Sequence, residues 1–449
     1  MTRRRVVITG LGPVTPIGVG VTDFWNGLLE GRNGVRRIRA FDPARFDSQI
    51  GGEIDSLSVA DCVPKSYRKA AKIMARDIVL AVVAAHRAVS DAGLRTKCLL
   101  ERGDAGGEPN FDCTRLGANI GAASICADLS ELAEALHSAA ESGSFSLARW
   151  GTEGMNNLTP LWLLKFLPNM LACHVTIVHD AQGPSNTITC GEASSHLAIG
   201  EAYRTIERGV ADVCICGGAE SKINPMALMR QSLGARLSRR NDSPEKACRP
   251  FANGRDGTAV SEGGGLVILE ELEHARRRGA RIYAELAGFG AASGVSRRGP
   301  AGTVGGDAAA VRLASQKALR DAGLSPEQVD LVSASGYGIV EQDRTEATGL
   351  VSLLGSATSR TPVLSIKGGI GNNGAGSGAI DFMATVLAMH NATLPPAINS
   401  TPLDTDCALR LNSAGPVDVR VDAALSTAFS LTGVQHAALV IRRYREGGA

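Results

Sequence analysis

An α/β fold built from two similar halves is what this sequence predicts. Short apolar runs rich in β-branched residues alternate with longer segments of helical periodicity, and Gly or Pro separates most of them. The helix ending HRAVSDAGL at 86–94 returns as QKALRDAGL at 316–324, and internal repetition bears on the whole fold. Two copies of one α/β unit, residues 1–270 and 271–449, explain this better than the alternative, a chance likeness of common helix endings.

The strands and helices follow from these patterns in chain order. Apolar, mostly β-branched runs predict strands over 5–10, 114–121, 186–190, 212–218, 265–272, 282–290, 329–336, 362–366 and 436–444. Helical periodicity predicts helices over 74–92, 127–141, 194–208, 270–278, 307–322, 341–354 and 374–390. The strands DVCICGG and DLVSASG both begin with Asp and close on Gly, a further likeness between the halves.

Two segments interrupt this alternation. The polar, Gly-rich start of 101–130 predicts an excursion over the surface. Residues 143–170 contain two of the three Trp and the apolar run LWLLKFL. A core helix is the expectation for that run, and a subunit interface is the alternative.

Composition excludes several classes of protein. The 449 residues are 44% hydrophobic and 20% charged, with a formal net charge of +2, so no global field attracts nucleic acid or an anionic membrane. No apolar window is long enough to span a membrane, and the basic N-terminal tip is not followed by a signal peptide. The ten Cys lack metal-site spacings and are expected to be reduced thiols in a cytoplasmic protein.

Several long segments resemble the elongating β-ketoacyl-acyl carrier protein synthases. They are LSRRNDSPEKACRPF and the adjoining stretch from Arg249 to Gly290, NMLACHVTI followed by GPS, SIKGGIGNNGAGSGA, and ALSTAFSLTGVQHAALVI near the end. The matches are colinear and cover the length of the chain. The resemblance implies the thiolase fold, a duplicated five-layer α-β-α-β-α architecture that is usually dimeric.

The resemblance also locates the family's catalytic positions. These enzymes condense acyl chains with malonyl units on an acyl carrier protein, using a Cys thiolate and two His. In this sequence the Cys position, at the corner where a strand leads into a helix, falls on Glu192. The His positions fall on Ser335 and Asn372. A carboxylate suits the N-terminus of the following helix but forms no thioester, so the scaffold is expected to lack the groups needed for condensation.

Other parts of the family's pocket are retained. Lys367 matches the pocket Lys, and Asp343 and Glu346 match an Asp-x-x-Glu motif. We interpret these three as a buried Lys–carboxylate network that supports the fold rather than as catalytic groups. Phe429 matches the gating aromatic, but the following SLTG replaces the usual Gly-rich sequence and predicts a less flexible loop.

Rival motifs are weaker. GIGNNG at 369–374 fits a dinucleotide fingerprint but lacks the acidic residue about 20 positions on. Cys190 would be a displaced nucleophile only if it reached the helix N-terminus from about 7 Å back, so a structural thiol is expected. His196 lies one turn from Glu192, within reach of a hydrogen bond, although a packing role is the ordinary reading. The basic clusters at 238–242 and 275–279 are expected to be solvated, with docking of an acidic carrier protein as the alternative.

A family-like sequence over the whole chain, with all three catalytic positions replaced, resembles one branch of the family. That branch is the chain length factor, or ketosynthase β subunit, of type II polyketide synthases. Such subunits lack the Cys, pair with a catalytic ketosynthase α subunit and shape the acyl tunnel. They commonly carry Gln at the corner, from which Glu192 departs. The resemblance implies a heterodimer and an acyl carrier protein that brings its own phosphopantetheine, with no other cofactor. The product class, whether aromatic, polyene or aryl polyene, does not follow from the sequence.

Two alternatives remain open. Glu192 would act as the general base of a carrier-dependent isomerase or cyclase if burial beside Lys367 and Asn372 raised its pKa. The chain would otherwise be a homodimeric protein that binds acyl carrier protein.

Overall fold

One large mixed sheet organises the molecule. The computed structural model describes residues 3–141, 143–295, 297–298 and 304–446. The main path of the sheet runs β17 (Arg410–Leu411), β15 (Pro362–Leu364), β14 (Leu331–Ser333), β19 (Ala423–Phe429), β20 (Gln435–Arg442), β11 (Ala284–Ser293), β1 (Val6–Thr15), β10 (Val260–Glu271), β9 (Val213–Ser221), β5 (Leu116–Gly121) and β8 (Ser185–Ile188). All nine predicted strands are present. β19 is an additional strand that the apolar pattern did not predict.

The two parts of the sheet repeat one strand order. β10 pairs antiparallel with β1 and β9, and β9 pairs parallel with β5. β20 likewise pairs antiparallel with β11 and β19, and β19 pairs parallel with β14. β1 and β11 join the parts through an antiparallel ladder. The duplication in the fold is therefore visible in its hydrogen bonding.

Matching glycines lie in VVITGLG at 6–12 and ELAGFG at 285–290, which occupy equivalent strands of the two halves. The β1 ladder shifts register between Ile8 and Gly10, and the β11 ladder shifts between Leu286 and Gly288. A Cβ on Gly12 would lie 2.1 Å from the Ala84 carbonyl oxygen, and one on Gly290 would lie 2.1 Å from that of Ala314. Only Gly permits so close an approach of strand and helix in either half.

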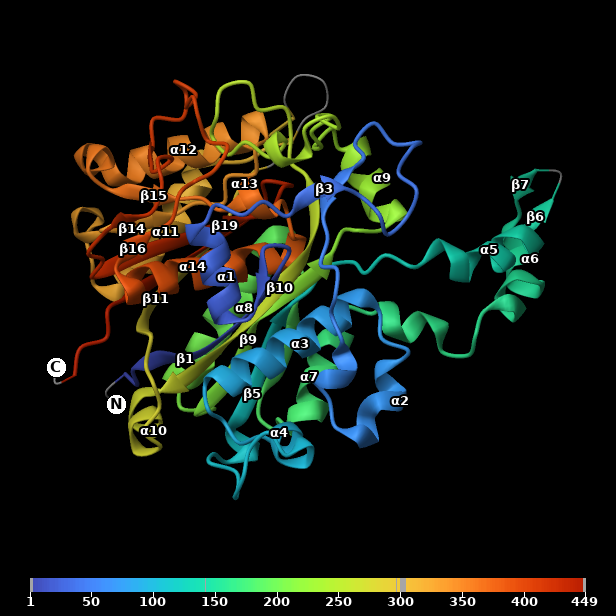
Figure 1. Ribbon diagram of the computed structural model, residues 1–449, viewed down its shortest axis with the longest axis horizontal. Coiled ribbons are helices and arrows are strands. Elements are labelled where there is room, and N and C mark those ends of the chain that lie inside the picture. The colour runs from blue at the N-terminus through green and yellow to red at the C-terminus, as the bar shows by residue number, and fades with distance from the viewer. Residues whose placement is uncertain (1–2, 142, 296, 299–303, 447–449) are drawn as a thin grey trace.

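Five layers result from the helices on either side of the two half-sheets (Figure 1). α8 (Ser194–Glu207) and α14 (Ser377–Asn391) lie in the middle and contact strands of both halves. α3 (Arg76–Asp91) and α7 (Met170–His179) cover the outer face of one half-sheet, and α11 (Ala308–Ala322) and α12 (Val340–Leu354) cover that of the other. Three large apolar cores fill the spaces between these layers, which agrees with the predicted layering.

Shorter elements complete the described part of the chain. The helices are α1 (Val21–Leu29), α2 (Arg68–Ala71), α4 (Lys97–Arg102), α5 (Leu129–Ser138), α6 (Leu147–Thr152), α9 (Pro225–Leu233), α10 (Leu272–Arg277) and α13 (Lys367–Ile370). The short strands are β2 (Gly18–Val19), β3 (Val35–Arg37), β4 (Ile50–Gly52), β6 (Ala140–Glu141), β7 (Ser144–Phe145), β12 (Arg297–Arg298), β13 (Val304–Gly305), β16 (Thr393–Leu394) and β18 (Val417–Asp418). No helix in the described ranges has both the length and the apolar composition needed to cross a membrane.

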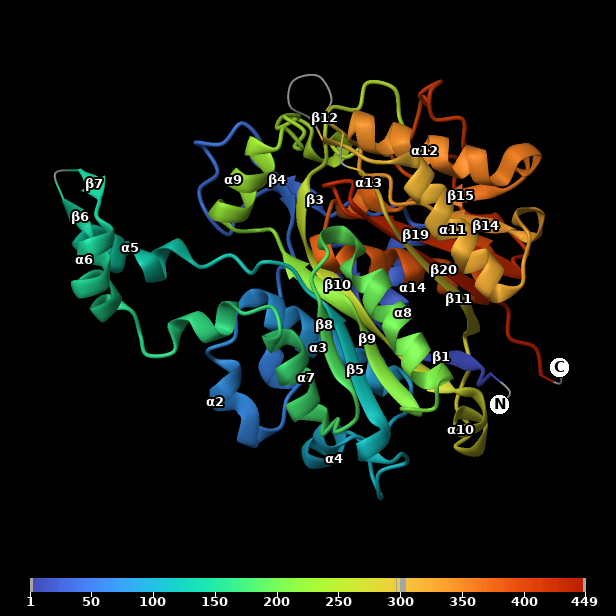
Figure 2. The same cartoon turned by 180° about the vertical axis from the view of Figure 1, so that it is seen from behind.

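The core helix expected within 143–170 is wrong. Residues 124–141 and 143–168, which we term the arm, stand away from the body on two extended connections (Figure 2). Near its two ends, Ile125 and Phe166 pack against the apolar core of the body. LWLLKFL there forms only a short 3-10 helix, Trp162–Phe166. Leu161 is 81% exposed and Leu163 is 60% exposed. Local hydrophobicity misled the prediction because it does not tell which apolar surface the same chain covers.

Candidate functional site

The site lies where loops follow the carboxyl ends of neighbouring strands. Glu192 follows β8 in the short 3-10 helix Gly191–Ala193, immediately before α8. Lys222 follows β9, and Ser335 follows β14. Asn372 lies between α13 and α14 and is held by backbone hydrogen bonds beside β10. Since neighbouring parallel strands end at the same edge of a sheet, loops distant in sequence meet here.

Glu192 is 4% exposed, and both of its carboxylate oxygens accept hydrogen bonds. Its Oε1 accepts hydrogen bonds from Lys222 Nζ at 2.9 Å and from Asn372 Nδ2 at 3.2 Å. Its Oε2 accepts one from the Leu431 backbone N–H at 2.9 Å. The structure therefore brings two of the three predicted catalytic positions into direct contact and adds a lysine that sequence reasoning missed.

The charge on Glu192 follows from these partners. Burial alone raises the pKa of this carboxyl, but the Lys222 ammonium and the Leu431 N–H oppose burial and hold the pKa at about 2. The general-base alternative requires a raised pKa for Glu192, so its prediction is wrong. Lys367 is also not the cation that pairs with this carboxylate.

Glu220 and Asn372 extend the cluster. Glu220 Oε1 lies 3.8 Å from Lys222 Nζ, and Glu220 Oε2 accepts a 2.6 Å hydrogen bond from the Ala375 N–H. Asn372 Oδ1 accepts from the Gly374 N–H at 2.9 Å. We call Glu192, Lys222, Glu220 and Asn372 the corner cluster. One buried lysine lies between two carboxylates in it.

Ser335 belongs to a separate network that fixes its own loop. Its backbone N–H donates to Glu346 at 2.8 Å, and the Gly336 N–H donates to the same carboxylate at 2.9 Å. Asp343 accepts 2.8 Å hydrogen bonds from the N–H groups of Tyr337 and Phe251. Both carboxylates are buried and bound by backbone donors, an arrangement that orders the loop. Burial outweighs these hydrogen bonds and raises the pKa of both carboxyls, that of Asp343 to about 7.

Lys367 and Phe429 both lie next to Tyr337. Lys367 forms a buried ion pair with Asp381, not with Asp343 or Glu346. Its Nζ also lies 5.4 Å from the centre of the Tyr337 ring. The Tyr337 and Phe429 rings pack edge to face at 5.3 Å, and the Tyr337 hydroxyl donates to the Phe429 carbonyl at 3.0 Å. Tyr337 is 1% exposed, so a large aromatic side chain fills the space beside the Ser335 loop.

Neither Cys190 nor His196 supplies the missing chemistry. Burial raises the pKa of Cys190, which disfavours the thiolate that a nucleophile needs. His196 Nε2 pairs with Ser426 Oγ at 2.9 Å and makes no hydrogen bond to Glu192. Burial lowers the pKa of His196 to about 3, so its ring is neutral and packs as an interior side chain.

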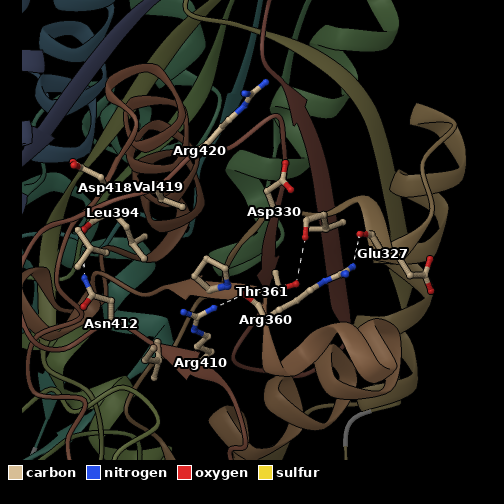
Figure 3. Close-up of a pocket in the computed structure, with 14 residues that line it drawn as sticks. Glu327, Asp330, Arg360, Thr361, Leu394, Arg410, Asn412, Asp418, Val419 and Arg420 are labelled. Atoms are coloured by element: carbon tan, nitrogen blue, oxygen red, sulfur yellow. Dashed lines mark hydrogen bonds between the residues drawn. The ribbon is translucent and has the colours of Figure 1, made fainter.

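A separate cavity of about 730 Å³ lies at the far end of the sheet (Figure 3). Its walls combine Arg360, Arg410 and Arg420 with three carboxylates, those of Glu327, Asp330 and Asp418. Arg360 and Arg410 donate to backbone carbonyls at 2.6 Å. The mixed charges give no single ligand preference, so the corner cluster remains the candidate site.

Comparisons with known proteins agree with this geometry. The chain matches the β-ketoacyl synthase N-terminal domain over residues 3–275 and the C-terminal domain over residues 283–401. A 3-oxoacyl-(acyl-carrier-protein) synthase 2 from Synechocystis is 33% identical over 99% of each chain. A putative polyketide beta-ketoacyl synthase 1 from Streptomyces halstedii is 37% identical over 90% of each chain. The solved ishigamide ketosynthase/chain length factor has a TM-score of 0.82 at 26% identity, covering 99% of this chain and 100% of that one.

These ketosynthases have the thiolase fold, and the layered, duplicated sheet described above is the same architecture. The predicted fold class is confirmed.

Proposed function

Since the chain belongs to the β-ketoacyl synthase family, we propose that it is a non-condensing chain length factor that forms a heterodimer with a catalytic ketosynthase in type II polyketide biosynthesis. One observation carries the proposal. The corner position, from which the family's nucleophile attacks, holds an ionised carboxylate bound by Lys222, Asn372 and Leu431. Such a group neither accepts an acyl chain nor takes up a proton near neutral pH.

The arm supports pairing with a second ketosynthase-like chain. Its exposed large apolar side chains are Leu129, Leu136, Phe145, Leu147, Met155, Leu161, Leu163, Leu164 and Leu167. Monomeric proteins rarely expose large contiguous apolar patches. The arm extends away from the body of its own chain (Figures 1 and 2), so its own chain leaves these side chains uncovered, as a surface for another subunit would be.

The free edge of the sheet supports the same partner. β8 ends the strand order and pairs only with β5 among the described strands. Ser185 and Asn186 in β8 are exposed. An unpaired edge is a template for another strand, and a subunit of the same fold offers a matching one.

A basic surface supports an acyl carrier protein as the second partner. Lys65, Arg68, Lys69 and Lys72 are all exposed, and no acidic residue lies between positions 64 and 76. The two basic clusters expected from sequence are less available. Arg239 and Arg240 pair with Asp47 and Asp256, and Arg278 pairs with buried Glu270.

Co-expression with a candidate catalytic ketosynthase tests the proposal. We expect a one-to-one complex and product formation only when both chains are present. Leu161→Glu in the arm should separate the chains, whereas Val210→Glu, at an exposed apolar residue outside the arm, should not. Separate elution of the unmodified chains, with full product formation by the ketosynthase alone, would refute the heterodimer.

Restoring only the nucleophile gives a second test. Glu192→Cys should not condense acyl and malonyl units, because Ser335 and Asn372 still supply no imidazole. Appreciable condensation by that variant would show that the assigned His positions are wrong. A thioester on the unmodified chain, detected by mass spectrometry, would refute the non-condensing role.

A further inference from the structure

The loop that follows Phe429 is tied to the body at successive residues. The Leu431 N–H donates to Glu192 Oε2 at 2.9 Å, and the Leu431 carbonyl accepts from Gln342 Nε2 at 3.0 Å. The Tyr337 hydroxyl binds the Phe429 carbonyl at 3.0 Å. Leu431 is itself 1% exposed. Side chains from two parts of the chain, Glu192 in one and Tyr337 and Gln342 in the other, therefore fix both polar groups of Leu431 and the start of the loop.

Lys222 orients the Glu192 carboxylate for its hydrogen bond with the Leu431 N–H. Its ammonium holds Glu192 Oε1, which leaves Oε2 directed at the Leu431 N–H. Glu220, 3.8 Å away, supplies a second negative charge to the same lysine and binds the Ala375 N–H of the Asn372 loop. A charged carboxylate is a stronger hydrogen-bond acceptor than a neutral group. Because the ion pair with Lys222 keeps Glu192 charged, it strengthens the hydrogen bond from the Leu431 N–H.

We propose that Glu192, oriented by Lys222, is a latch that keeps the 429–434 loop closed over the degenerate site. Tyr337 fills the space beneath the loop, and the latch prevents the loop from moving away. The phosphopantetheine thiol of a carrier protein is thereby excluded from this subunit and left to the partner. That last consequence rests on the proposed function, whereas the latch is a property of this chain alone.

Amide hydrogen exchange on the full-length chain tests the latch. Glu192→Met removes the acceptor for the Leu431 N–H at nearly constant side-chain size, and Glu192→Gln retains an acceptor. Both leave Lys222 next to Glu220. Peptides covering 429–434 should exchange at least tenfold faster in Glu192→Met than in Glu192→Gln. Equal exchange in the two variants would overturn the proposal.

Tyr337→Phe provides a variant that keeps the packed ring, in case Glu192→Met does not fold. It deletes the hydrogen bonds of the hydroxyl, to the Phe429 carbonyl and to the Ser335 side chain, and we expect severalfold faster exchange of the same peptides. Unchanged exchange there would show that the loop is held by packing and not by these ties.

Thiol reactivity tests closure of the site. Ser335→Cys places a thiol on a fully buried position. Its reaction with N-ethylmaleimide, followed on its own peptide by mass spectrometry, should be at least tenfold faster when combined with Glu192→Met than when combined with Glu192→Gln. Equal rates would refute closure by the latch. Neither measurement involves a partner, so a failed heterodimer and a failed latch give different results.

Discussion

Removing the positive charge of the corner cluster should destabilise the fold more than removing any exposed lysine. In Lys222→Met two buried carboxylates, Glu192 and Glu220, lose their common cation. Breaking one side of a buried ion pair costs about 3–5 kcal/mol. Lys165→Met is the matched control, because Lys165 lies 2.5 Å from Glu131 in the partly exposed arm. Exposed pairs contribute about 0–1 kcal/mol.

A double-mutant cycle separates the ion pair from the loss of packing. Glu192→Gln should cost about 1–3 kcal/mol, because Lys222 keeps Glu220 as a partner. The double variant should lose less than the sum of the single losses, by about 0.5–3 kcal/mol, since Glu192 then carries no unpaired charge and only Glu220 lacks its cation.

Urea unfolding at pH 7, followed by far-UV circular dichroism, gives the free energies of unfolding. The reasoning is refuted if Lys222→Met loses no more stability than Lys165→Met, or if the two corner substitutions are additive. The pKa of Glu192 is lowered to about 2 in the folded chain. Its contribution should therefore be complete above pH 4.5, the ordinary value, and be lost as the pH falls through about 2.

Three further perturbations have defined outcomes. Burial lowers the pKa of His196 from 6.5 to about 3, so only the unfolded chain binds this proton between those values. Stability should fall by about 1.4 kcal/mol per pH unit on acidification below 6.5, and His196→Gln should remove that part of the slope in urea titrations at pH 7 and pH 5. A Cβ on Gly374, where φ is +57°, would lie 1.7 Å from Glu220 Oε2. Gly374→Ala should lower the unfolding free energy by more than about 1 kcal/mol, whereas Gly151→Ala, in open space in α6, should be neutral or stabilising. Deleting apolar surface from the arm by Leu161→Ser should leave the melting temperature of the isolated chain within about 2 °C of the original, because exposed substitutions change stability little. A large loss would mean that the arm packs on its own body.

Contacts between distant segments explain why the site was only half predictable. The positions of Glu192, Ser335 and Asn372 follow from motifs in the sequence, and the structure joins Glu192 to Asn372 directly. Lys222 had no signal of its own except that it lies four residues after the predicted strand 212–218. Tyr337 lies two residues after Ser335, but its role in filling the site depends on the packing of Phe429.

The sequence by itself determined the fold class, the duplication and the absence of a Cys and two His from the family's positions, because periodicity and motifs are carried by neighbouring residues. Only the tertiary structure decided the charge state of Glu192, the exposure of the arm and the fixing of the loop after Phe429. Those properties depend on groups up to 239 positions apart, and on which surfaces the same chain leaves uncovered. Electrostatic interactions and burial depend on distance in space, and position in sequence does not fix that distance.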